Sequence, residues 1–319
     1  PLEQFHLSSF QRFISNISWS VLGKVCVQIL LFGVSIFLTR YLGKERLGDY
    51  ATLLVIPVFI RLMNSLGLET LINKKLPELN VQDPSGGQGR YLIARLLVLR
   101  FLTTLCFCIL LYFILPYYLD FINTQRLIEF RWILILYFIV ITVDSILSTL
   151  FMTLLRFKTL AKTEILGALL NLLLLGLFIS LDYGIRGVLY AYILSASATS
   201  IIYLILARRQ YLGPTKKPEW DDMGHLAWVS YGISFLGFGL MTQSDVLLLN
   251  FFNVGRGDIG LYHLVTGLGG TMAFLLAGVA PMALSLFSET YAKDGIKSLG
   301  KLYCQIVGLA SYLTIPIYV

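Results

Sequence analysis

Long stretches of apolar residues recur along almost the whole chain, and each is long enough to cross a bilayer as a helix. A helix needs about 20 such residues to span roughly 30 Å of hydrocarbon. The chain is 57% hydrophobic and only 13% charged, whereas about a quarter of the residues of a soluble protein are charged. We therefore expect an all-α integral membrane protein with about nine spans, at 17–42, 48–72, 91–118, 130–155, 159–181, 185–207, 226–252, 258–288 and 297–319.

Positive charge is distributed unevenly between the two sides of this arrangement. The amino terminus and the connections after the second, fourth, sixth and eighth spans hold more Lys and Arg than the other connections. By the positive-inside rule the amino terminus is cytoplasmic in a multi-pass protein. The net charge of +7 follows from this bias and from basic residues inside spans. No basic loop is long enough, or carries the interleaved aromatic residues, to predict nucleic-acid binding.

The two ends of the chain give separate expectations. Residues 1–16 place Phe10, Phe13 and Ile14 at helical spacing, which is typical of an amphipathic helix lying on the membrane surface. The chain begins at Pro1 without a methionine and ends inside an apolar run. We therefore expect it to be a fragment of a longer protein.

Two turns share a sequence pattern, GKERLGDY after the first span and GRGDIGLY after the seventh. Three residues recur at a separation of 212: Gly43, Gly48 and Tyr50 return as Gly255, Gly260 and Tyr262. Six spans separate the copies, so the repeats have the same orientation. The pattern predicts two six-helix lobes in parallel repeat around a central cavity, with the second lobe truncated.

The most polar, proline-containing stretch of the chain lies where these lobes would join. We therefore assign residues 17–207 to an amino-terminal six-helix lobe and 208–224 to a cytoplasmic linker. Residues 225–319 would then hold the first three helices of a carboxy-terminal lobe. The substrate path is expected between the two lobes, near the bilayer midplane.

Arg61 is the strongest candidate for a residue that lines this path. It lies near the middle of the second apolar run, too deep to reach the headgroups easily, and a guanidinium at that depth costs about 2.5–3.5 kcal/mol even on the lenient insertion scale. Such residues usually face a water-filled path. The alternative is a structural arginine bound to helix carbonyls in a bundle core. Asn64, one turn further along, is a second candidate for the cavity.

The first span carries a polar stripe on one face, formed at helical spacing by Ser20, Lys24, Gln28, Ser35 and Thr39. Of these residues Lys24 and Gln28 are candidates for the substrate cavity, although Lys24 is also shallow enough to snorkel to the cytoplasmic surface. In the third span Arg100 is a cavity candidate. Arg95 lies close enough to the inner boundary that we expect it to anchor the helix.

Two acidic residues also fall inside spans, Asp144 in the fourth and Asp245 in the seventh. Either could carry a coupling proton or sodium ion, or pair with an arginine. For Asp144 the alternative is a buried ion pair with Arg61 or Arg100. For Asp245 it is a structural role at the outer end of its lobe.

The residues that bind metals and cofactors show no such pattern. The four cysteines all lie in apolar runs, and the three histidines have no partner at ligand spacing. Motifs of zinc proteases, P-loops and nucleophile elbows do not occur. We expect no metal, no cofactor and no disulfide.

Short motifs along the chain resemble the polysaccharide or O-antigen flippase branch of the multidrug/oligosaccharidyl-lipid/polysaccharide (MOP) exporter superfamily. Residues 39–43 (TRYLG) and 48–50 (GDY) are similar to the turn that ends the first span of these proteins. Residues 66–68 (LGL) before 73–75 (NKK) resemble the end of the second span. Residues 243–250 (QSDVLLLN) ahead of 260–262 (GLY) resemble the signature of the seventh.

This resemblance implies a transporter of the bacterial or archaeal plasma membrane that flips an undecaprenyl-diphosphate-linked oligosaccharide to the outer leaflet. It implies membrane lipids as surroundings, and a polysaccharide polymerase and chain-length proteins as partners. Arginine suits such a cargo because its planar fork can bind a phosphate bidentately.

Three alternatives remain open. A multidrug or other cation exporter of the same superfamily would need an acidic cavity, and a lipid II flippase usually has a more densely charged first span than this one. A membrane glycosyltransferase or polymerase would need a large extracytoplasmic loop with catalytic residues, and the outer connections here are short. We therefore expect no enzyme activity.

Overall fold

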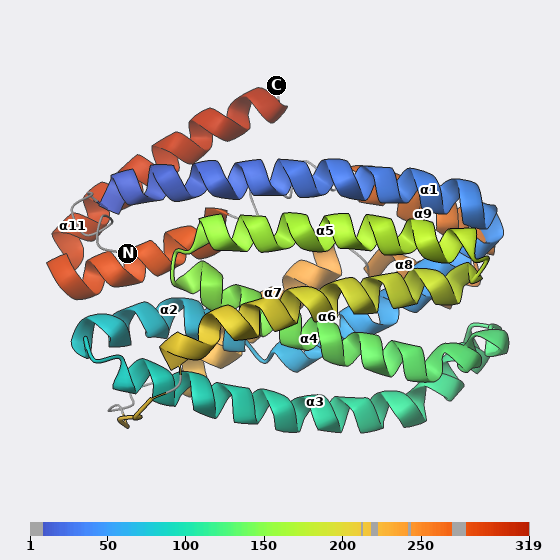
Figure 1. Ribbon diagram of the computed structural model, residues 1–319, viewed down its shortest axis with the longest axis horizontal. Coiled ribbons are helices and arrows are strands. Elements are labelled where there is room, and N and C mark those ends of the chain that lie inside the picture. The colour runs from blue at the N-terminus through green and yellow to red at the C-terminus, as the bar shows by residue number, and fades with distance from the viewer. Residues whose placement is uncertain (1–8, 212, 218–222, 242–243, 270–278, 319) are drawn as a thin grey trace.

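The computed structural model describes residues 9–211, 213–217, 223–241, 244–269 and 279–318, and within these ranges the regular structure is helical. The long helices run roughly side by side along the longest axis of the molecule (Figure 1). The expected all-α membrane architecture is confirmed. Large apolar side chains such as Phe101, Tyr117 and Leu173 are exposed on its outer surface, where a bilayer would cover them.

The first helix, α1 (Ser9–Ser65), contains the first two expected spans. It is interrupted at Gly43, where φ is 66° and ψ is 175°, a conformation that glycine adopts without steric cost. The chain turns back there, and the second half of α1 runs in the opposite general direction to the first (Figure 1). Ser9–Asn16 continues directly into the first span, and residues 1–8 of the expected surface helix lie outside the described residues.

The second expected span ends earlier than the sequence indicates. Leu66 and Gly67 have positive φ values of 47° and 70°, and they break the helix before the shorter α2 (Leu68–Gln82). Apolar character continues across this break, which is why hydropathy alone extends the span to residue 72.

The remaining spans of the first lobe are continuous helices. They are α3 (Gly87–Phe121), α4 (Arg131–Thr153), which follows the 3₁₀ turn η2 (Gln125–Phe130), α5 (Phe157–Ser180) and α6 (Gly184–Tyr211). Within the described residues, five segments are long and apolar enough to cross a membrane, and the first of them, Ser18–Ser65, is 48 residues long and includes the bend at Gly43.

The second half of the chain forms α7 (Met223–Met241), α8 (Ser244–Phe251), α9 (Arg256–Gly269) and α11 (Val279–Tyr318). Like α1, α11 is interrupted by a glycine with positive φ, Gly295. The seventh and eighth expected spans include residues outside the described ranges, and the lobe boundaries at 207 and 225 stay predictions.

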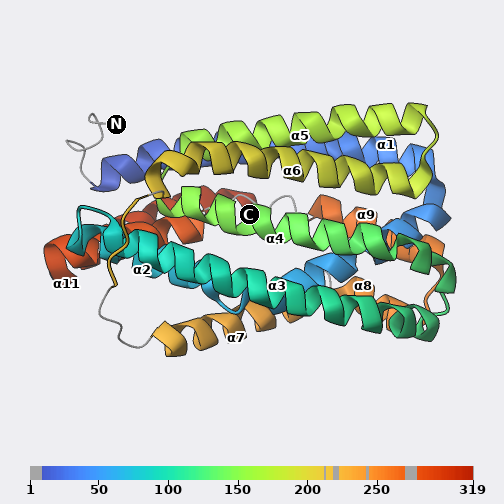
Figure 2. The ribbon, with the colours of Figure 1, turned by 60° about the horizontal axis from the view of Figure 1, so that its bottom comes forward.

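Helix α1 lies between the two halves of the molecule. It contacts α4, α5 and α6 of the first half and α7, α8, α9 and α11 of the second, and Figure 2 shows α5 and α6 on the side opposite α7. Close approach depends on small residues: a Cβ added at Gly23 would lie 2.6 Å from the Cβ of Ala161 in α5. Small residues allow helices to pack closely inside a membrane.

Replacing Gly23 with leucine should therefore destabilise the first lobe. Overpacking a close contact costs about 1–3 kcal/mol, and the neighbouring atoms here include the α5 backbone. The midpoint of thermal unfolding in detergent should fall. Gly33→Leu is the matched control on the same helix, because a Cβ added at Gly33 meets nothing within 4 Å; equal midpoints for the two variants would contradict the packing described here.

Candidate functional site

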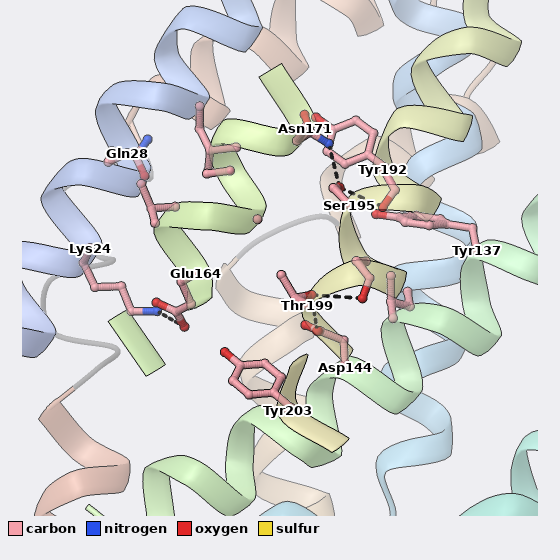
Figure 3. A pocket seen from close by; sticks show the side chains of 16 residues that line it. Lys24, Gln28, Tyr137, Asp144, Glu164, Asn171, Tyr192, Ser195, Thr199 and Tyr203 are labelled. Atoms are coloured by element: carbon pink, nitrogen blue, oxygen red, sulfur yellow. Dashed lines mark hydrogen bonds and ion pairs between the residues drawn. The ribbon is translucent and has the colours of Figure 1, made fainter. Parts of the chain in front are cut away.

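A polar cavity of about 300 Å³ lies between α1, α4, α5 and α6, in the first half of the chain (Figure 3). Two carboxylates, one amine and several hydroxyl and amide groups line it among apolar side chains. The polar and aromatic lining residues are Lys24, Gln28, Tyr137, Asp144, Glu164, Asn171, Tyr192, Ser195, Thr199 and Tyr203. The structure thus brings together three of the residues selected from sequence, Lys24, Gln28 and Asp144.

Lys24 enters this cavity from α1 and pairs with a carboxylate on α5. Its Nζ lies 3.4 Å from Oε1 of Glu164, and both side chains are partly exposed. The ion pair partly neutralises Glu164 at a depth where an isolated charge would be costly. Lys24 thus points toward the interior of the lobe.

Asp144 accepts hydrogen bonds from α6. Thr199 Oγ1 donates at 2.7 Å and Ser200 Oγ at 3.3 Å to the same carboxylate oxygen. The described residues include no cation within ion-pairing distance of this carboxylate. With Asp144, Glu164 and Lys24 all ionised, the cavity carries a net charge of −1.

A second, basic cluster lies where α1, α2, α3 and α4 meet. Arg100 is 4% exposed and forms an ion pair with Glu69, and it also donates to the backbone oxygen of Asn64. Arg61 Nη1 donates to Ser145 Oγ at 3.0 Å, and this hydroxyl in turn lies 3.4 Å from Oε1 of Glu69. Glu69 is therefore shared between two arginines, one bound directly and one through Ser145.

Arg61 differs from Arg100 and Lys24 in its partners. Among the described residues, no carboxylate lies within ion-pairing distance of its guanidinium. Its hydrogen bond to Ser145 places it beside Glu69 and Arg100, because the same hydroxyl lies 3.4 Å from Oε1 of Glu69. Two arginines against one glutamate leave the basic cluster with a net charge of +1, next to the negative cavity.

Several buried polar atoms of the basic cluster have no hydrogen-bond partner among the described residues. They are Asn64 Oδ1, Ser65 Oγ and Arg100 Nε, although Asn64 Nδ2 does donate to Thr104 at 2.9 Å. Buried polar atoms are nearly always paired, with protein or with ordered water. This cluster can therefore bind water or a polar ligand.

A further cavity of about 220 Å³ lies between α1 and α6 of the first half and α9 of the second. Gln28 and Tyr192 line both this cavity and the larger one. The Tyr50 hydroxyl donates to that of Tyr192 at 3.0 Å, and the Tyr50 ring meets His263 edge-on at 6.1 Å between centroids. Ser35 and Thr39 also line it, so part of the polar stripe of the first span faces this space.

Asp245 belongs to neither group. It lies in the first turn of α8 and accepts a hydrogen bond of 2.6 Å from the hydroxyl of Tyr262 on α9. The contact ties two neighbouring helices of the second half together. Arg95 is exposed on α3, away from the residues that line the larger cavity.

Two contributors to these sites were not selected as site residues from the sequence. Glu164 follows basic residues at the start of a span, a position typical of a solvated helix end, yet its carboxylate reaches Lys24 in the cavity. His263 has no ligand-spaced partner in the sequence, and only the tertiary contact with Tyr50 places it beside a cavity. The presence of Lys24 inside the first span could have prompted a search for an acidic partner inside another span, which would have identified Glu164. No local sequence signal places His263 beside a cavity.

Comparison with known proteins gives a consistent result. Residues 13–287 match the family described as polysaccharide biosynthesis protein, and no curated protein matches the chain. An outward-facing multidrug resistance MATE family transporter of the MOP superfamily has a TM-score of 0.76 at 15% identity, over 98% of this chain and 72% of that chain.

Two more solved structures have a similar fold. A MOP superfamily transporter from Pyrococcus furiosus, whose binding pocket is described as having reverse polarity, has a TM-score of 0.73 at 14% identity, over 98% of this chain and 71% of that one. A MATE protein in complex with Br-NRF gives 0.69 at 17% identity, over 97% and 74%.

At such identities these structures establish the fold, which is that of membrane transporters. The superfamily resemblance predicted from short motifs is confirmed, because the family match covers most of the chain and the fold agrees with it. The chain is a multi-pass membrane protein with the fold of the MOP transporters, and it belongs to the polysaccharide biosynthesis protein family.

Proposed function

We propose that the protein flips an undecaprenyl-diphosphate-linked oligosaccharide from the inner to the outer leaflet of a bacterial or archaeal plasma membrane. It would do so by alternating access between its two lobes, in the synthesis of O-antigen, capsule or exopolysaccharide. The headgroup of such a cargo cannot cross hydrocarbon unaided, because its hydroxyls and charges would lose their water partners. A polar passage through the protein can replace those partners.

The observation that carries this proposal is the position of Arg61. It lies on the half of α1 that follows the bend, its guanidinium donates to Ser145 of α4, and no carboxylate among the described residues lies within ion-pairing distance of it. Arg100 is next to it and shares Glu69 with it. A net positive charge at membrane depth suits an anionic group, and guanidinium binds phosphate oxygens with two parallel hydrogen bonds.

Nearby polar groups can serve the sugars. Asn64 Oδ1 and Ser65 Oγ are buried with unused hydrogen-bonding capacity beside the arginines. The cavity between α1, α6 and α9 offers Gln28, Tyr50 and His263, a mixture of amide, hydroxyl and aromatic surface that suits a carbohydrate. The polyprenyl tail would stay in the bilayer while the headgroup passes between the lobes.

A second binding role is favoured by the negative cavity of the first lobe. Asp144 and Glu164 line it with a single amine, that of Lys24, so the cavity attracts cations while the arginine cluster attracts anions. We propose that Asp144, whose carboxylate accepts from Thr199 and Ser200 and has no basic partner among the described residues, carries the coupling ion, a proton or sodium. The same acidic lining is the one observation that favours the alternative function, export of a cationic drug. Measuring flipping and dye export on the same variants, as described below, distinguishes the two functions.

The cellular setting follows from the same proposal. The cytoplasmic amino terminus predicted from the loop charges places the basic connections in the cytoplasm. A polysaccharide polymerase and chain-length proteins would act on the flipped product at the outer surface. The class of substrate requires no metal or cofactor in the transporter.

Arg61→Ala in the intact protein should abolish flipping while membrane insertion stays normal. Loss of a charged hydrogen-bond partner costs about 1.5–3 kcal/mol, which corresponds to a fall in transport of roughly tenfold or more. Arg61→Lys should keep a little activity, because lysine supplies the charge without the planar fork. Translocation of a labelled polyprenyl-diphosphate oligosaccharide in proteoliposomes measures both.

The control for this experiment is Arg186→Ala. Arg186 pairs with Glu129 at the surface, and both side chains are about half exposed, so this pair contributes about 0–1 kcal/mol. Its loss should leave transport close to the wild-type rate. Full activity of Arg61→Ala would refute the role of that residue in the passage, and export of cationic dyes by a variant inactive in flipping would favour drug export.

Asp144→Asn should remove the response of transport to an imposed pH or sodium gradient. Asparagine keeps an oxygen that can accept from Thr199 but has no charge to bind a cation. Asp245→Asn is the comparison, because Asp245 binds Tyr262 away from the cavity and should keep the response. The measurement is the transport rate of each variant with and without an imposed pH or sodium gradient. An unchanged gradient response in Asp144→Asn would show that coupling occurs at another residue.

A further inference from the structure

The two turns that share a sequence pattern touch each other in the folded protein. The bend of α1 at Gly43 lies beside the start of α9 at one end of the molecule (Figure 1). Leu47 and Tyr50 of the first turn line the smaller cavity, but the residues that touch across the two turns line neither cavity; they are Lys44, Gly48, Arg256 and Gly260. The contact therefore needs an explanation separate from the binding of cargo.

The contact between the turns is reciprocal. A Cβ added at Gly48 would overlap the backbone oxygen of Arg256, and a Cβ added at Gly260 would lie 2.7 Å from the backbone oxygen of Lys44. Gly48 and Gly260 are equivalent positions of the repeat, and so are Lys44 and Arg256. Each turn thus presents its glycine to the same backbone oxygen of the other, as in a two-fold symmetric interface.

A second contact joins equivalent positions of the repeat, further along the chain in α2 and α11. Ser285 Oγ of α11 donates to the backbone oxygen of Asn73 of α2 at 3.3 Å, and these residues are also 212 positions apart. One approximate two-fold axis therefore relates both contacts. They lie at the two ends of the space between the halves of the molecule.

Polar contacts surround the glycine turns and join the two halves of the chain. Arg256 donates to Thr52 Oγ1 at 3.1 Å and to the backbone oxygen of Ile122 at 2.9 Å. Asn123 donates to Asn253 at 3.1 Å. These bonds join the second turn, and Asn253 just before it, to parts of the first half that flank the first turn, and each of them can be exchanged for a bond to water when the turns separate.

We propose that the Gly43–Tyr50 and Gly255–Tyr262 turns form the outer gate of the passage, and that this gate is closed in the present structure. The distribution of Lys and Arg among the loops predicts that this end of the molecule faces the outside of the cell. The proposal rests on the transport function proposed above, and it assigns the gate to backbone contact between Gly48 and Gly260. Opening to the outside separates these turns. The polar bonds around them then exchange their partners for water, so opening does not leave buried donors unpaired.

Glycine is required at both positions because the closed gate leaves no room for a side chain. The atoms that a new Cβ would meet belong to backbone, which cannot move aside as a flexible side chain can. A methyl group should therefore disfavour closure while the open state is unaffected. A transporter that cannot close one gate cannot complete its cycle.

Gly48→Ala and Gly260→Ala test this requirement, with Gly33→Ala as the control. Each gate variant should lower transport by about tenfold or more, because overpacking shifts the equilibrium away from closure by about that factor. Gly33 lies on the same helix as Gly48 in open space, so its alanine variant should transport at the wild-type rate. Wild-type transport by Gly48→Ala would overturn the proposal.

A reversible crosslink tests the movement itself, and it stays informative if a glycine variant fails to fold. A Cβ added at Gly257 would lie 3.5 Å from Cγ of Lys44, so Lys44→Cys with Gly257→Cys should form a disulfide. The four native cysteines, which are free, are replaced first. Oxidation should lower the transport rate of this double variant by about tenfold or more, and reduction should restore the rate.

The crosslinking experiment tests the gate, and the Arg61→Ala experiment tests the assignment of the cargo. Crosslinking needs no cargo, so failure of the pair to crosslink in membranes, or full transport by the crosslinked protein, would contradict the gate alone. Unchanged flipping by Arg61→Ala would contradict the assignment of the cargo alone.

Discussion

Charged groups inside a hydrocarbon layer need partners, and in this protein they find them between helices of the first half. A charge on a lipid-facing helix costs several kcal/mol, and three charged groups within the spans have partners on neighbouring helices. Lys24 meets Glu164, Arg100 meets Glu69, and Asp144 accepts from two hydroxyls of α6. Arg61 is bound to a serine, and that incomplete pairing is the basis of the proposed function.

The consequence is a pair of neighbouring sites with opposite charge. The larger cavity holds two carboxylates against one amine, and the neighbouring cluster holds two arginines against one glutamate. Binding of a cation at Asp144 would change the field at the arginines, and release of an anion would change the field at Asp144. If binding at each site changes the affinity of the other, the binding of the ion and the binding of the lipid-linked anion are coupled in both directions.

Much of the arrangement follows from local patterns in the sequence. Apolar length predicts the first six spans, and the 4-residue spacing along the first span places Lys24 and Gln28 on one face, which does line a cavity. The break at Leu66 and Gly67 could not be predicted, because apolar residues continue across it and only backbone dihedrals reveal it. Partner choice could not be predicted either: Arg100 selects Glu69 rather than Asp144 through the packing of α2 against α3, a contact that no single helix specifies.

The position of the diphosphate in a structure of the intact protein, solved with a bound polyprenyl-diphosphate sugar, tests the central claim most directly. We predict phosphate oxygens within hydrogen-bonding distance, about 3 Å, of the Arg61 guanidinium, with the sugar extending between the lobes toward Tyr50 and His263. A diphosphate bound elsewhere, with Arg61 still joined to Ser145 or turned toward the acyl chains, would contradict it.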